Sequence, residues 1–229
     1  MSSGQSSTIL NEKSEKRLKL TKRSRTRKIR NLLFHERKLN NSGYSLIAGV
    51  GEAGRGPLAG PVVAGACIIK DVKFTADIDD SKKLSAKKRQ IAYEEILTKC
   101  IVGIGIVDEK AIDEINIYRA TIRAMEEAIA NLALKPDYII VDGRMKLSTK
   151  CPLKCIIGGD GLSLSIAAAS IIAKVTRDRL MLKYDELYPQ YGFARHKGYG
   201  TRLHKETLEK HGPSPIHRYS FSPIRNLAK

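Results

Sequence analysis

The feature that most constrains the fold is a glycine-rich segment, GVGEAGRGPLAG, at Gly49–Gly60. The apolar run Ser45–Val50 leads into it, and the run Pro61–Ile69 follows it. Both runs have the composition of β-strands, and glycine and proline mark the connection between them. Two strands joined this closely are predicted to pair antiparallel.

The connection itself has the residue types of a binding loop. Glu52 stands at the end of the first strand, and Gly54 and Gly56 flank Arg55. Glycines on both sides of an arginine let the backbone approach a ligand closely while the guanidinium binds a phosphate.

The remaining chain alternates predicted helices and strands. Three further strands are expected at Ile101–Val107, Asp137–Val141 and Leu153–Ile157, and helices at Ser85–Lys99, Tyr118–Leu134, Ser163–Tyr184 and Arg202–His211. Ser85 is expected to cap its helix, whose apolar face would carry Ile91, Ile96 and Leu97. Strands first, then alternating helix and strand, predict an α/β fold with a mixed sheet covered by helices.

The charge of the chain favours a polyanionic partner. Lys and Arg total 41 against 24 acidic residues, a formal net charge of +17. Nucleic acid is the commonest partner of such a chain, and an anionic membrane surface or simple solubility are the alternatives. Aromatic residues make up 6% and tryptophan is absent, which argues against a base-stacking platform.

Residues 1–30 differ in composition from the rest. They are rich in Lys, Arg, Ser and Thr, so we predict a disordered basic arm that adds affinity for phosphates. An organellar targeting peptide and a functionless tail are the alternatives. Residues 31–229 are predicted to form one domain, with a C-terminal helical and loop region from about residue 189.

The cysteines and the hydropathy favour a cytoplasmic protein. Cys151 and Cys155 have no second cysteine pair at zinc-site spacing, and Cys67 and Cys100 lie within apolar or helical segments. Reduced thiols are therefore expected. No apolar run approaches the ~20 residues of a membrane span, so we expect no membrane association.

Three carboxylates stand where strands end or helices begin: Glu52, Asp142 and Asp160. Side chains at such positions can meet in one cleft and offer oxygen ligands to Mg²⁺ or Mn²⁺, and two such ions can promote phosphodiester hydrolysis. Each residue alone has a structural alternative. Asp160 could cap the following helix, Asp142 could form a turn with Gly143, and Glu52 could pair with Arg55.

Several ordered motifs together resemble one family. They are GVGEAGRGPLAGPV from Gly49, DSKKLS at Asp80–Ser85, VDG at Val141–Gly143, SLSIAAASIIAKVTRDRLM at Ser163–Met181, HKGYGT at His196–Thr201 and PIHRYSF at Pro215–Phe221. From about residue 34 to residue 224 the chain resembles ribonuclease HII, the type 2 ribonuclease H family. The resemblance implies a ribonuclease H-like fold with a mixed five-stranded sheet flanked by helices. It also implies metal-dependent cleavage of RNA in RNA–DNA hybrids and 5′ of ribonucleotides embedded in duplex DNA.

The resemblance assigns catalytic and metal-binding roles to Glu52, Asp142 and Asp160. The family's first catalytic aspartate corresponds to Gly51, which offers no ligand atom, and Gly158 stands where the family commonly has lysine. We therefore expect strongly reduced or absent activity with Mg²⁺ or Mn²⁺, two ions in the intact family site. The alternative is a catalytically silent binder of RNA–DNA junctions.

The residues that the resemblance assigns to substrate binding are retained. The loop Gly54, Arg55 and Gly56 would read the ribose at the junction, Tyr199 would pack on the adjoining deoxyribose, and Ser81 and Lys82 would contact phosphate. A monomer is expected. A nucleotide-binding loop in GEAGRGPLAG is a weaker interpretation, because the Gly-Lys-Ser/Thr ending of a P-loop is missing.

Overall fold

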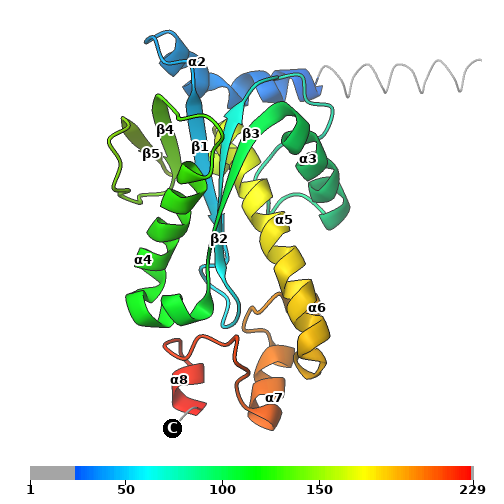
Figure 1. Cartoon of the computed structure of the whole chain (residues 1–229). Helices are drawn as coiled ribbons and strands as arrows, with labels where there is room; N and C mark the ends of the chain where they lie inside the picture. Colours follow the sequence, from blue (N-terminus) through cyan, green and yellow to red (C-terminus); the bar gives the residue numbers. More distant parts are fainter. Residues whose placement is uncertain (1–23, 228–229) are drawn as a thin grey trace, which may run out of the picture.

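The computed structural model describes residues 24–227, so residues 1–23 of the predicted arm lie outside the described part. The elements are α2 (Phe34–Asn40), β1 (Ile47–Ala53), β2 (Val62–Ile69), α3 (Ala86–Lys99), β3 (Cys100–Val107), α4 (Glu109–Ala130), β4 (Tyr138–Asp142), β5 (Leu153–Ile156), η1 (Gly159–Gly161), α5 (Leu164–Leu187), η2 (Pro189–Tyr191), α6 (Phe193–His196), α7 (Arg202–His211) and α8 (Ile224–Leu227) (Figure 1).

The five strands form one mixed sheet in the order β3-β2-β1-β4-β5. β1 pairs antiparallel with β2, as predicted, and β2 pairs antiparallel with β3. β1 and β4, and β4 and β5, are parallel. The predicted mixed five-stranded sheet is therefore confirmed, and the strand bounds differ from the predicted ones by three residues or fewer.

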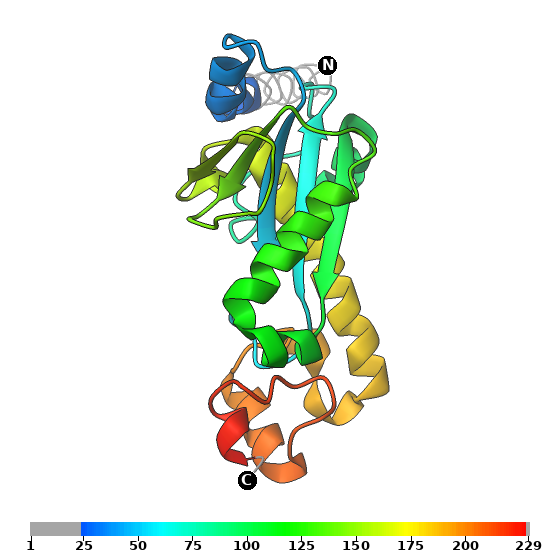
Figure 2. The ribbon, with the colours of Figure 1, turned by 60° about the vertical axis from the view of Figure 1, so that its left-hand side comes forward.

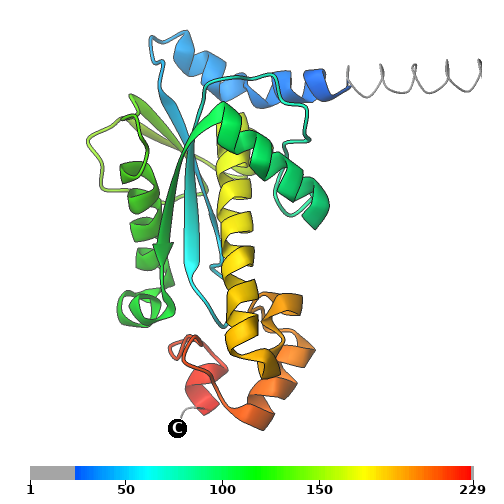
Figure 3. The same cartoon turned by 45° about the vertical axis from the view of Figure 1, so that its right-hand side comes forward.

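Helices cover both faces of the sheet. α4 packs on one face, and α5 packs with α3 on the other (Figure 3). The alanine-rich start of α5 is fully buried, and it lies close to the strands because glycines face it. A Cβ atom added to Gly65 of β2 would come within 2.4 Å of the Ala169 carbonyl oxygen. This close packing fixes α5, whose N-terminus follows one of the predicted catalytic carboxylates.

The described part of the predicted disordered arm is a helix instead. Residues 24–32 are helical, and Ile29, Leu32 and Leu33 are buried in the core shared with α3 and α5. These apolar residues recur at the i, i+3 and i+4 spacing of one helix face. The surrounding Lys and Arg residues hide that pattern in the composition.

The face of α3 also differs from the prediction. Ile96 is fully buried, but Ile91 and Leu97 are 50% and 47% exposed. The buried face consists of Ala92, Tyr93 and Ile96. This face is buried because β3 and α5 pack against it. The hydrophobicity of the residues alone does not decide which face is buried.

At two other helix starts, a polar side chain accepts a hydrogen bond from a backbone N–H group of the first turn. Ser85 Oγ accepts a hydrogen bond from Lys88 N, which confirms the predicted cap. α4 begins at Glu109, earlier than predicted, and bends at Asn116, whose φ is +67°. Asn116 Oδ1 accepts from Tyr118 N (3.0 Å), so the predicted start at Tyr118 is the first turn after the bend.

The C-terminal region forms a separate helical layer at one end of the sheet, with α7 at the predicted bounds (Figure 2). Its apolar core includes Phe193, Leu208 and Ile216, with Leu58 and Met181 from the main body. This core places the C-terminal segments against the glycine-rich connection. In the described part of the chain, no helix combines the length and hydropathy needed to cross a membrane.

Candidate functional site

The glycine-rich connection forms a tight loop between β1 and β2. Gly54 has φ +99°, a left-handed conformation that favours glycine, and a Cβ atom there would lie 2.2 Å from Arg177 Nε. Glu52, at the end of β1, lies with its Oε1 atom 3.7 Å from Arg55 Nη1. The ion-pair alternative for Glu52 is thus present, at a distance too long for a hydrogen bond.

Two buried arginines hold this loop through hydrogen bonds to its backbone carbonyl groups. Arg218 donates hydrogen bonds to the carbonyl oxygens of Gly54 (2.6 Å), Arg55 (3.1 Å), Pro57 (2.8 Å) and Gly60 (2.7 Å). Arg177 donates to the carbonyls of Ala59 (3.0 Å), Pro61 (2.9 Å) and Lys197 (2.9 Å). Burial lowers the pKa of Arg218 to about 9 and that of Arg177 to about 10, so both remain charged at neutral pH. Two charged, buried guanidinium groups therefore fix the conformation of the loop.

Sequence reasoning missed both anchors, although their motifs were noted. Asp178, the residue after Arg177, accepts a hydrogen bond from Lys174 Nζ at 2.7 Å. The signal that could have found Arg218 is its place within the PIHRYSF motif at Pro215–Phe221.

Tyr199 lies beside the loop and is 44% exposed. A Cβ atom at Gly56 would be 3.9 Å from Tyr199 Cε1, and the Arg177 guanidinium carbon is 6.0 Å from the ring centre. Arg55, Gly56 and Tyr199 are therefore exposed close to one another, and Gly54 is buried beside Arg177.

Three buried histidines support Tyr199 from behind. His204 Nδ1 lies 3.0 Å from the Tyr199 carbonyl, and His204 Nε2 lies 2.9 Å from His217 Nε2. The His196 ring stacks on that of His204, with centroids 4.3 Å apart. All three residues are buried and pack within the C-terminal region.

The predicted carboxylates share one edge of the sheet. Asp142 ends β4, and its Oδ1 atom accepts from Gly159 N at 2.8 Å, which ties it to the turn that carries Asp160. Burial raises the pKa of Glu52, and the charge of Asp142 adds to the increase. The pKa of Asp160 is raised by burial and by the charges of Asp142 and Asp80. Asp142 thus acts electrostatically on both Glu52 and Asp160, and Asp80, which the prediction had not included, acts on Asp160.

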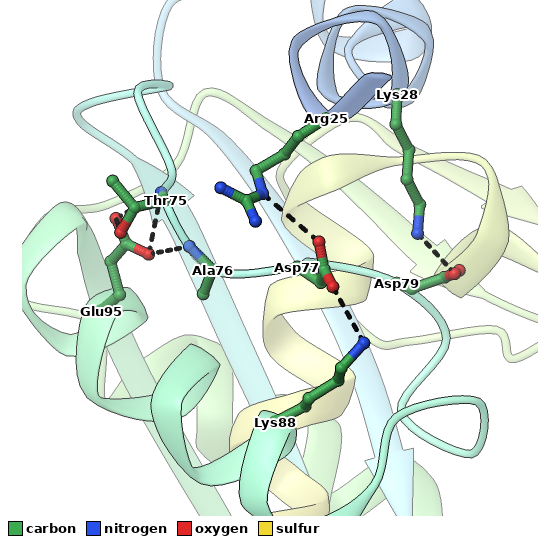
Figure 4. Close-up of polar contacts among 8 residues, drawn as sticks. All are labelled: Arg25, Lys28, Thr75, Ala76, Asp77, Asp79, Lys88 and Glu95. Atoms are coloured by element: carbon green, nitrogen blue, oxygen red, sulfur yellow. Dashed lines mark hydrogen bonds and ion pairs between the residues drawn. The ribbon is translucent and has the colours of Figure 1, made fainter. Parts of the chain in front are cut away.

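Lys82 belongs to the same group, because its charge opposes the raised pKa of both Glu52 and Asp160. Ser81 is only 7% exposed, and its carbonyl accepts a hydrogen bond from Arg89 Nη1. Its hydroxyl is thus less accessible to a phosphate than the side chain of Lys82. This loop is further held by Asp77, which pairs with Arg25 of the 24–32 helix and with Lys88 of α3 (Figure 4).

Gly51 lies next to this edge. The last paired residues of the parallel strands β1 and β4 are Val50 and Val141, so Gly51 and Asp142 follow side by side. A Cβ atom at Gly51 would lie 2.2 Å from Ser170 Oγ and 3.1 Å from Ser170 N. The space of a side chain at position 51 is thus taken by α5.

The carboxylates supply oxygen ligands suited to Mg²⁺ or Mn²⁺. Within residues 24–227, however, no three Asp, Glu, His or Cys side chains converge closely enough to hold an ion. Gly51 is the residue next to Asp142 on the neighbouring strand, and glycine has no side chain that could offer a ligand atom there. The residues present therefore do not complete an ion site.

Comparison with known proteins identifies the family of this chain. The protein-family model for Ribonuclease HII matches residues 48–224. The chain belongs to the ribonuclease HII family. Ribonuclease HII of Acholeplasma laidlawii is 54% identical over 202 residues, 88% of this chain and 98% of the relative. The protein of the same name from Geotalea daltonii is 51% identical over 199 residues, 86% of this chain and 92% of the relative. The crystal structure of ribonuclease H2 from Pyrococcus horikoshii superposes with a TM-score of 0.68 at 28% identity, covering 80% of this chain and 97% of that one.

Membership of the ribonuclease HII family places the chain among divalent-metal-dependent nucleases that act on RNA–DNA hybrids. Gly51 and Gly158 both lie beside the predicted carboxylates, Gly51 next to Asp142 and Gly158 two residues before Asp160. Gly158 has φ +66° and no atom within 4 Å of a Cβ position, so a lysine there would have room but a strained backbone. The glycine-rich loop, by contrast, is held by the hydrogen bonds of Arg177 and Arg218.

Proposed function

We propose that this chain binds RNA–DNA hybrids and duplex DNA with embedded ribonucleotides, and that it cleaves them far more slowly than an intact ribonuclease HII. One contrast supports the proposal. Eight hydrogen bonds from Arg177 and Arg218 to loop and tail carbonyls hold the proposed recognition loop. The carboxylate edge lacks a ligand at Gly51.

In this proposal the backbone of Gly54–Gly56 reads the ribose 2′-hydroxyl, which distinguishes RNA from DNA at one position. Tyr199 packs on the adjoining deoxyribose, and Lys82 contacts a phosphate near the carboxylates. Glu52, Asp142 and Asp160 are the remaining family ligands for Mg²⁺ or Mn²⁺. We also propose that the protein is monomeric and acts in the cytoplasm.

The test is single-turnover cleavage of a duplex that contains one ribonucleotide, by this chain and by its Gly51→Asp, Gly158→Lys variant. We expect the variant to be at least about a hundredfold faster, because fixed charge at the reacting phosphate carries much of the rate enhancement. Binding is measured in parallel against an all-DNA duplex. Equal cleavage rates in both proteins would overturn the proposed impairment. Undetectable cleavage with retained preference for the ribonucleotide would identify the chain as a silent junction binder.

A further inference from the structure

A basic groove lies between the N-terminal helices and the turn that carries Asp160. Its volume is about 990 Å³, and its walls include Arg30, Arg37 and Lys38 on one side and Gly161 and Leu162 on the other. Gly161 follows Asp160 directly in the chain. The groove therefore ends beside the turn that carries Asp160.

The helical wall of the groove is strongly cationic. Residues 24–40 contain six Lys or Arg residues and one acidic residue, Glu36, which is buried. None of the carboxylates in the described part of the chain pairs with Arg30, Arg37 or Lys38. The acid on the groove wall, Asp79, is neutralised by Lys28 Nζ at 2.6 Å (Figure 4).

This wall is attached firmly to the body of the protein. Arg25 Nε lies 3.3 Å from Asp77 Oδ1, and Ile29 is buried in the core. Glu36 Oε1 accepts hydrogen bonds from Ser163 Oγ (2.6 Å), Ser165 N (3.0 Å) and Ser165 Oγ (2.7 Å). The carboxylate thus joins α2 to the N-terminus of α5, close behind the Asp160 turn. The groove is preformed.

Exposed, unpaired guanidinium and ammonium groups along one groove favour a chain of phosphates. The charge of Lys154, on the edge strand, also acts on His35 in the groove wall, which extends the positive region across β5. A duplex carries its charges at regular intervals along its axis, which suits such an extended surface.

We propose that this groove is a second phosphate-backbone binding surface, which holds the flank of a nucleic acid duplex beyond the Asp160 side of the site. The proposal rests on the proposed function for its ligand. It adds a contact region outside the junction itself, whose basic residues Arg30, Arg37 and Lys38 precede the part of the chain matched by the family model.

The test compares two triple variants of the full chain. In the groove variant Arg30, Arg37 and Lys38 are changed to Gln. In the matched control Arg119, Lys135 and Lys150 are changed to Gln; these residues are exposed, pair with no described carboxylate and lie outside the groove. Both variants lose the same charge, and their melting temperatures are checked first.

Affinity is measured by fluorescence anisotropy at several salt concentrations. The duplex extends about one helical turn, about 10 base pairs, on each side of a single ribonucleotide. We expect the groove variant to bind about tenfold more weakly and its salt slope to fall by about two to three. The control should change little. Preference for the ribonucleotide over all-DNA duplex should be the same in the groove variant and the unmodified chain.

An equal loss of affinity in both variants, or no loss in either, would overturn the groove proposal. If the unmodified chain shows no preference for the ribonucleotide, the proposed function fails. A selective loss in the groove variant would still support the groove as a duplex-binding surface in that case.

Discussion

Acidification should destabilise the C-terminal region and with it the support of Tyr199. His204 and His217 are both buried, and their hydrogen bonds fit only neutral rings. His204 Nδ1 donates to the Tyr199 carbonyl, His217 Nε2 donates to His204 Nε2, and His217 Nδ1 accepts from Ser214 N at 2.8 Å. Each ring nitrogen that could take up a proton is already an acceptor.

The pKa values reflect this arrangement. Burial is the main cause that lowers the pKa of His204, and likewise that of His217, from 6.5 to about 4. In the unfolded chain both residues titrate near pH 6.5. Below that pH the unfolded state therefore binds protons at these histidines, whereas the folded state does not until the pH falls to about 4. Stability is therefore fully present above about pH 6.5 and is lost progressively down to about pH 4. One pKa unit corresponds to about 1.4 kcal/mol, so each histidine costs about 2 kcal/mol by pH 5. This is a large part of the 5–15 kcal/mol that is typical of a domain.

The measurement is urea unfolding between about pH 7.5 and pH 5. A His204→Gln, His217→Gln variant should be less stable at pH 7.5 but should lose less stability on acidification. The control is His211→Gln, which changes an exposed histidine of α7 and should keep the full pH dependence. Glu52 has a raised pKa, so its contribution changes in the opposite direction, and the comparison with the double variant removes it. The same pH dependence in the unmodified chain and in the double variant would refute the assignment. Preference for a ribonucleotide should fall over the same pH range, because a proton on His204 Nε2 removes the acceptor for His217 Nε2–H and disrupts the packing behind Tyr199.

Two further substitutions and one deletion test other parts of the structure and of the binding proposal. Arg218→Lys cannot reach the loop carbonyls that the guanidinium holds, so the melting temperature should fall and preference for the ribonucleotide should drop about tenfold, by anisotropy. Glu36→Gln should lower the free energy of unfolding by about 1–3 kcal/mol in urea, because it replaces a charged acceptor at the start of α5. Deleting residues 1–23 should reduce the salt dependence of binding and leave preference for the ribonucleotide unchanged.

The sheet was predictable from the sequence because strands and turns are local patterns. Glycine and proline punctuate the apolar runs, and a carboxylate at a strand end is placed at the sheet edge by the strand itself. Glu52 and Asp142 were found in this way. The sequence order of strands and helices also indicated a mixed, helix-covered sheet.

The anchors of the recognition loop were not predictable in the same way. A buried arginine is tolerated only where several carbonyls converge, and the carbonyls that Arg218 meets are about 160 residues away in the chain, with separations of 158 to 164. No local pattern encodes that convergence. The face of α3 was missed for a similar reason, because the neighbouring elements decide that Tyr93 and not Ile91 is covered.

Metal binding gives the most direct test of position 51. Aspartate placed there would stand beside Asp142, but its Cβ atom would meet Ser170 Oγ at 2.2 Å, so α5 must shift or Ser170 must change rotamer. Without metal, Gly51→Asp should therefore be destabilised, both by this contact and by repulsion from Glu52 and Asp142. The additional variant Ser170→Ala should recover part of the loss. Adding Mn²⁺ should reverse the order, because an ion bound only by the folded state contributes about 2.7 kcal/mol at a hundred times its dissociation constant. Melting temperatures across a Mn²⁺ titration provide the measurement. An equal or larger shift for the Gly51 chain would show that position 51 takes no part in holding the ion, and that the slow cleavage expected of this chain must have another cause.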